Sequence, residues 1–99
     1  MDTVDVIYYI NKAGTYVQFS LPVHTRELGE LNAYESLLKE SIRKNFGVLF
    51  DTYGMDFASE SAYLVNAGEE AINMVICLLG RTDPELERSL ARLGIRRGE

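Results

Sequence analysis

The chain has 99 residues, of which 46% are hydrophobic and 25% charged, a composition typical of one globular domain. No apolar run reaches the roughly 20 residues of a membrane span, and the acidic N-terminus lacks the pattern of a leader, so we expect a cytoplasmic protein with no membrane partner. Residues 1–80 carry five basic against eleven acidic side chains, which disfavours nucleic acid as a partner. With a single cysteine, Cys77, and a single histidine, His24, the chain has no internal disulfide and no Cys/His zinc site, and we expect no metal or cofactor.

Two segments near the N-terminus alternate apolar or aromatic residues with polar ones. Residues 3–10 and 16–21 follow the period of two that is typical of strands, and the turn sequence NKAGT lies between them. Gly14 supplies the positive φ that such a turn needs. The simple hairpin register places Tyr9 and Tyr16 together, on the face opposite the apolar residues of the second strand.

Two helices are predicted, one in the middle of the chain and one near its end. Asn32 and Glu35 have the spacing of a capping box, and Gly47 is a suitable stop for the helix that they begin. Residues 48–50 are a short strand candidate after that stop. The second helix opens at Asp83-Pro84 and ends at Gly94, where only a short basic tail, residues 96–99, follows.

The most apolar run of the chain, residues 70–79, has two interpretations. As a strand it is buried on both faces and pairs with a preceding strand over residues 61–66, after a turn at 67–69. As a helix over residues 69–79 it would have no polar face, which a domain of this size hardly accommodates. We favour the strand, in which Cys77 is a small buried core residue.

These elements predict an α+β fold in the order β-β-α-β-β-β-α, within a single domain over residues 1–95. An antiparallel sheet of about five strands carries two helices on one face. The helical alternative for residues 69–79 changes the order to β-β-α-β-β-α-α. Such a sheet leaves one face and at least one edge to be covered.

Five side chains are candidates for a protein interface. Tyr9 and Tyr16 lie on the face of the hairpin that points away from the core, and tyrosine is enriched at interfaces. Arg88, Arg92 and Arg96 recur every four residues toward the C-terminus and favour an acidic partner surface. The acidic body of a second copy is one such surface, so we expect a homodimer.

Four side chains are weaker candidates for a pocket. His24 has carboxylates near it in sequence and suits a general base. Asp51 and Asp56 flank Tyr53 in a loop-like segment, where paired carboxylates suit a divalent cation or acid–base chemistry. This constellation requires His24 to meet the two aspartates in space.

Three functions follow from these candidates. The leading hypothesis is a small non-enzymatic protein–protein interaction module, a homodimeric adaptor or regulator. The first alternative is a small-ligand or metal-binding regulator or enzyme that uses His24, Asp51 and Asp56. The second alternative is an acidic decoy that inhibits a nucleic-acid-binding partner, for which we expect carboxylates gathered on one surface and binding that salt weakens.

Overall fold

The predicted N-terminal hairpin is present as β1 (Asp5–Asn11) and β2 (Gly14–Val23). The computed structural model describes residues 4–59, 62–65 and 72–98. The turn forms as expected: the side-chain oxygen of Asn11 accepts a hydrogen bond from the Ala13 amide at 2.8 Å, and Gly14 has a φ of +139°. The register pairs Tyr9 with Tyr16.

The apolar run forms a strand, β5 (Ile72–Gly80), in the middle of the sheet. It pairs with β2 on one side and with two short strands, β3 (Asp56–Phe57) and β4 (Ala62–Val65), on the other. Both short strands are antiparallel to β5, so they form one interrupted edge strand. The helical alternative is therefore wrong for Ile72–Gly80, whereas the predicted turn at 67–69 lies outside the described residues.

The C-terminal segment differs from the predicted tail. Arg96–Arg97 forms β6, which runs parallel to β1 and gives the sheet the order β3-β5-β2-β1-β6. The Gly98 amide donates to the Tyr8 carbonyl oxygen at 2.7 Å. The sheet is consequently mixed rather than entirely antiparallel. The sequence did not indicate this strand, because backbone pairing with the exposed edge of β1 needs no apolar pattern in the added strand.

The first helix, α1 (Leu28–Asn45), begins before the predicted capping box at Asn32. The carboxylate of Glu27 caps it instead, accepting hydrogen bonds from the amides of Gly29 at 3.0 Å and Glu30 at 2.7 Å. Both amides are donors that the helix itself cannot satisfy. The helix can therefore begin at Leu28 without leaving these two amides unsatisfied.

The strand predicted at residues 48–50 is wrong, because these residues belong to a short helix, α2 (Gly47–Asp51). Gly47 does not have the positive φ of a helix stop; it opens α2 directly after the break at Phe46. The last helix, α3 (Pro84–Arg92), begins and ends as predicted, with Asp83 at its N-cap and Gly94 at a φ of +78° after it.

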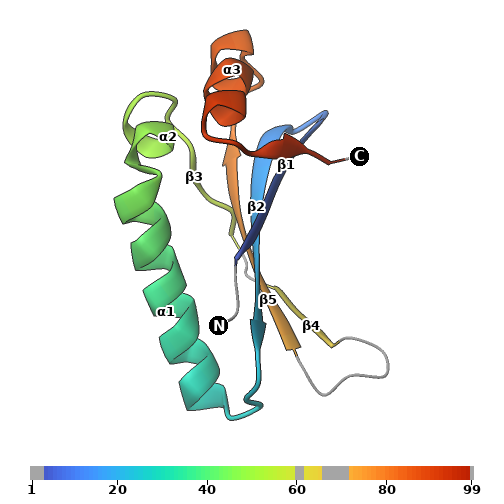
Figure 1. Cartoon of the computed structure of the whole chain (residues 1–99), viewed down its shortest axis with the longest axis vertical. Helices are drawn as coiled ribbons and strands as arrows, with labels where there is room; N and C mark the ends of the chain where they lie inside the picture. The colour runs from blue at the N-terminus through green and yellow to red at the C-terminus, as the bar shows by residue number, and fades with distance from the viewer. Residues whose placement is uncertain (1–3, 60–61, 66–71, 99) are drawn as a thin grey trace.

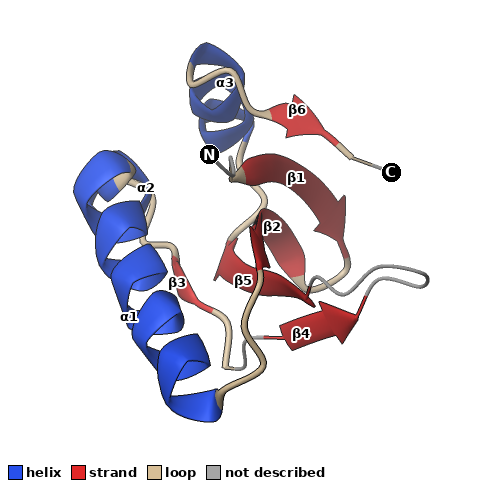
Figure 2. Ribbon diagram, turned by 60° about the horizontal axis from the view of Figure 1, so that its bottom comes forward, coloured by secondary structure: helices blue, strands red, loops and turns tan. Residues whose placement is uncertain are grey.

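The core lies on one face of the sheet, and all three helices of the described chain pack there (Figures 1 and 2). Figure 2 shows α1 and α2 along the side of β3, with α3 next to β1 and β6. Alternation along the strands sends Tyr8, Phe19 and Met74 into this layer. Leu49 of α2 and Leu90 of α3 complete it, each with no exposed surface. The predicted α+β architecture with helices on one face is confirmed.

One buried polar group within the core has an expected effect on stability. The Thr15 side chain is completely buried, and its hydroxyl has no hydrogen-bond partner among the described residues. A buried hydroxyl without a partner costs about 1–3 kcal/mol. Replacing Thr15 by valine keeps the β-branched shape and removes that cost, so we expect the free energy of unfolding to rise by about 1 kcal/mol.

Chemical unfolding of the Thr15→Val protein measures this change, with Thr15→Ser as the matched control. Serine keeps the hydroxyl and removes the methyl group, so the control should lose stability. A Thr15→Val protein less stable than the wild type would show that the hydroxyl is satisfied.

Candidate functional site

The side of the sheet opposite the helices carries a continuous set of side chains that we call the open face. Because side chains alternate along strands, the strand registers define its members. The buried apolar side chains of the described helices all pack against the other face of the sheet. Except for Val75, which is buried, the members of the open face are partly exposed. The centre of the open face consists of Ile7, Tyr9, Tyr16, Gln18, Ser20, Val75, Cys77 and Leu79; Pro22 and Asn73 continue it toward one end, and Asp5 lies at its margin.

Two tyrosines and the cysteine form a connected group on the open face. The rings of Tyr9 and Tyr16 are stacked, with centroids 5.1 Å apart and planes 8° from parallel. The Tyr9 hydroxyl lies within hydrogen-bonding reach of the sulfur of Cys77 on β5, across the intervening strand β2. The group therefore spans all three central strands, and each ring is held in place by a neighbour.

The Cys77 thiol and the Tyr9 phenol are both held in their protonated, uncharged forms. Burial raises the pKa of the Cys77 thiol, and the hydrogen bond from Tyr9 only partly offsets that rise. Burial likewise raises the pKa of Tyr9, with smaller contributions from Cys77 and Tyr16. Since a reactive cysteine needs a lowered pKa, Cys77 has the character of a contact residue rather than of a nucleophile.

Charged residues are confined to the margins of the open face. At one margin, Nη2 of Arg96 lies 3.4 Å from a carboxylate oxygen of Asp5. At the other, Nη2 of Arg43 lies 3.7 Å from Asp56, and the guanidinium also stacks on Phe57 with 5.0 Å to the ring centroid. Among the described residues, the surface between these margins offers apolar and hydrogen-bonding groups but no charge.

The arginine candidates fall on different sides of the sheet. Arg88 pairs with Glu85 within α3, and Arg92 lies exposed on the same helix, so both are on the helical side. Arg96 is not part of a helical stripe, because it lies in β6 beside Ile7 at the margin of the open face. The structure therefore brings Arg96, but neither other arginine, to the two tyrosines.

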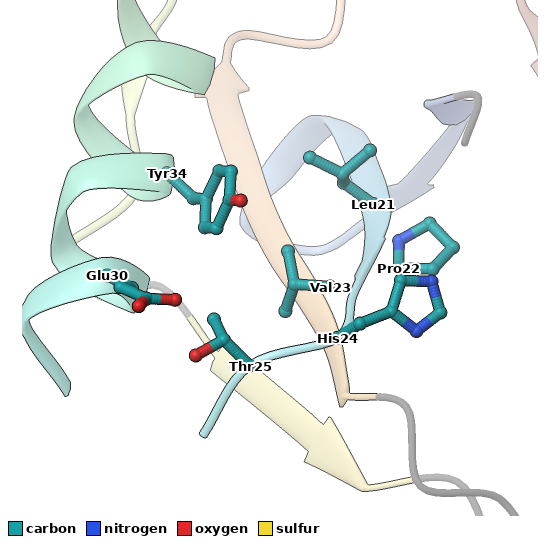
Figure 3. Close-up of a pocket in the computed structure, with 7 residues that line it drawn as sticks. All are labelled: Leu21, Pro22, Val23, His24, Thr25, Glu30 and Tyr34. Atoms are coloured by element: carbon teal, nitrogen blue, oxygen red, sulfur yellow. The ribbon is translucent and has the colours of Figure 1, made fainter. Parts of the chain in front are cut away.

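His24 lines a hollow of about 380 Å³ between the end of β2 and the first turns of α1 (Figure 3). Figure 3 shows Glu30 and Tyr34 extending from α1 toward β2, with Thr25 below them and the imidazole of His24 turned toward the ring of Pro22. The hollow thus combines one carboxylate, one imidazole and one phenol with apolar walls. It contains neither of the aspartates predicted to join His24.

Those aspartates lie elsewhere. Asp51 and Tyr53 line a second hollow of about 490 Å³ with Arg81 of the loop before α3. The Tyr53 hydroxyl is hydrogen-bonded to Ser89 at 2.5 Å, which fixes α3 against the loop after α2. Asp56 lines neither hollow and instead pairs with an arginine. Within the described residues, no three acidic, cysteine or histidine side chains are grouped as metal ligands.

The described carboxylates are interspersed with basic residues rather than gathered on one surface. Ion pairs within 4 Å join Glu35 to Lys39 and Glu87 to Arg97, in addition to the marginal pairs of Asp5 and Asp56. Each of these carboxylates is partly neutralised by its neighbour. This arrangement gives the acidic-decoy hypothesis no specific support.

Sequence reasoning missed Cys77 as a surface residue. The strand was expected to be buried on both faces, whereas its Cys77 side is partly exposed. The strand pairing accounts for this exposure, since Cys77 pairs with Gln18, a polar residue of the solvent face of β2. A strand partner is therefore more informative about burial than the apolarity of the strand itself.

Comparison with known proteins gives no relative from which a function can be transferred. No protein-family model, curated protein or solved structure matches the chain. None of the helices in the described residues has the length and apolar character to cross a membrane. A function must therefore be inferred from the geometry of the chain itself.

Proposed function

We propose that this chain is a small, non-enzymatic protein-interaction module that forms a homodimer through the open face and acts as an adaptor or regulator. The observation that supports it is the composition of that face. Antiparallel sheets often leave one face to solvent, but such faces are ordinarily polar. Here Ile7 and Leu79 accompany the stacked Tyr9 and Tyr16, and the interior is uncharged. Depletion of charge and enrichment of tyrosine distinguish the centres of protein interfaces.

The size of the open face sets the expected affinity. The open face lies on three strands about 4.8 Å apart and extends over about 17 Å of each, which gives a flat area of roughly 250 Å². A standard interface buries about 800 Å² on each partner, and smaller ones are weak or transient. We therefore expect a dimer with a micromolar dissociation constant, which concentration and partners can regulate.

Replacing Tyr16 by arginine tests this proposal directly. Arginine keeps a long apolar stem but places a charge in the uncharged centre of the face, where a second copy would have to desolvate it. We expect dimerisation to weaken at least thirtyfold, equivalent to about 2 kcal/mol. Light scattering coupled to gel filtration, over a range of protein concentrations, measures the change.

Tyr34→Arg is the matched control, because Tyr34 is exposed on α1, on the helical side of the sheet. This variant should remain as dimeric as the wild type. Circular dichroism and thermal melting establish that both variants are folded. Equal association of the folded Tyr16→Arg and Tyr34→Arg proteins would remove the open face from the interface.

A further inference from the structure

Strand β6 covers only part of the outer edge of β1, beside which it lies (Figure 2). The register pairs only Ile7 and Tyr8, of the seven residues of β1, with β6. Within the described residues, β1 has no strand partner on this side beyond Tyr8. A hollow of about 610 Å³ lies there instead, where β6 ends and β1 continues. Its lining residues are Tyr9, Ile10, Asn11, Arg97 and Gly98.

The sequence of β1 makes its edge prone to pair with other chains. Residues 6–10, VIYYI, are β-branched or aromatic and include no charge, proline or glycine. A segment of this kind associates readily when its edge is free, and proteins protect such edges with short or charged strands. Strand β6 has both properties, because its two residues are arginines and both are exposed.

Strand β6 is attached to the domain without apolar burial of its own. Ile95, directly before it, is the last buried side chain of the described segment. Two ion pairs hold β6, Arg96 with Asp5 at 3.4 Å and Arg97 with Glu87 at 3.6 Å, and both arginine side chains are more than half exposed. Exposed pairs are weak and are screened by salt. A segment held in this way opens locally at far lower free energy than the whole domain unfolds.

We infer that β6 is a detachable cover, which opens from Arg96 onward while the domain stays folded, and that the released edge of β1 pairs with β1 of a second copy. This inference goes beyond the proposed function, because it uses the edge of the sheet and not the open face. A second β1 can pair along all seven residues, whereas β6 pairs with two. It therefore forms more backbone hydrogen bonds than the cover that it replaces.

The charges of β1 favour its own copy as the occupant of this edge. Asp5 lies at the start of the strand and Lys12 directly after its end, with no charge between them. An antiparallel pair of β1 strands centred on Tyr8 brings Asp5 of each copy next to the partner's Lys12, and opposite charges across strands are stabilising. Opening of β6 also releases Asp5 from Arg96 for this contact.

A double charge reversal in β6 should open the cover. Replacing Arg96 and Arg97 by glutamate (R96E/R97E) removes both ion pairs and places like charges against their former carboxylate partners. R88E/R92E is the matched control, since it makes the same change of charge at two exposed arginines of α3. Circular dichroism and thermal melting establish that both proteins are folded.

Hydrogen exchange followed by NMR measures the opening. The Gly98 amide, which donates to the Tyr8 carbonyl oxygen at 2.7 Å, should exchange roughly tenfold faster in R96E/R97E than in the control. The Ile95 amide, which donates to the Leu90 carbonyl oxygen at 3.0 Å, should exchange equally slowly in both proteins. Equal rates at Gly98, or a rate at Ile95 that rises with that at Gly98, would overturn the detachable cover.

Sedimentation equilibrium at high micromolar concentration tests the second copy. The mean mass of R96E/R97E should be about twice that of R88E/R92E, because edge pairing joins two copies in addition to any contact through the open face. Equal masses would overturn the pairing of β1 strands. A control that stays at 11.2 kDa, while R96E/R97E reaches twice that mass, would refute the open-face homodimer and support the edge pairing. The two proposals therefore fail separately.

Discussion

Replacing Gly14 by alanine is expected to lower the free energy of unfolding by about 3–5 kcal/mol, from backbone strain of about 1–3 kcal/mol and a steric overlap of similar size. The φ of Gly14 is +139°, a conformation that residues with a Cβ rarely adopt. A Cβ at this position would also overlap the carbonyl oxygen of Gly80 on β5. Because both groups belong to paired strands, relief of the overlap requires the sheet to separate locally. Thermal unfolding should show a melting temperature lower by roughly 20 °C.

Gly54→Ala is the matched control for the Gly14 substitution. Gly54 also has a positive φ, +65°, but a Cβ there would meet no described atom within 4 Å. Only the conformational cost applies, which is about 1–2 kcal/mol. Equal losses for the two variants would mean that the close approach of Gly14 to Gly80 contributes nothing.

Truncation of Phe19 is the second change with a large expected effect. The ring is 1% exposed at the centre of the helix-covered face, and it contacts Phe46 edge-to-face with centroids 5.3 Å apart. Phe46 lies at the break between α1 and α2, so Phe19 supports both helices from the sheet. We expect Phe19→Ala to cost about 3–5 kcal/mol in urea unfolding, through lost burial and the cavity that remains.

A phenylalanine at the edge of the sheet provides the comparison. Phe57 is partly exposed on β3, where Arg43 stacks on it, so its truncation should cost less than half as much. Similar losses for Phe19→Ala and Phe57→Ala would contradict the placement of the core on the centre of the helical face.

Elements whose stability depends on local patterns could be predicted from the sequence. The hairpin follows from alternation and from Asn11 and Gly14, which together determine the turn. The last helix follows from Asp83 and Pro84, whose preferences agree with the first turn. The same alternation correctly places Tyr9 and Tyr16 on one face of the hairpin, and the short turn then pairs them directly.

Elements that depend on partners distant in sequence could not be predicted in the same way. Strand β6 exists because its backbone pairs with β1, and its two arginines carry no strand signal. The start of α1 depends on Glu27, which is not among the preferred caps, so the Asn32 pattern was more conspicuous. Residues 48–50 are apolar in either conformation, and a run of three has no measurable period.

The sequence predicted only some of the interface candidates, because one strand of the open face is positioned by contacts with segments distant in sequence. Tyr9 and Tyr16 follow from hairpin register, but the contribution of β5 depends on which of its faces meets the helices. Cys77 was therefore expected in the core, although it lies beside the tyrosines. His24 and the two aspartates were grouped by residue chemistry alone, and the chain places them in separate parts of the fold.

Sedimentation equilibrium of the wild-type chain, from about 2 to 200 μM, tests the central claim that the open face joins two copies. The expected affinity is micromolar, so the mean mass should rise from near 11.2 kDa toward twice that value across this range. The rise should persist at high salt, because the centre of the face is uncharged. A mean mass of 11.2 kDa at every concentration would contradict the proposal.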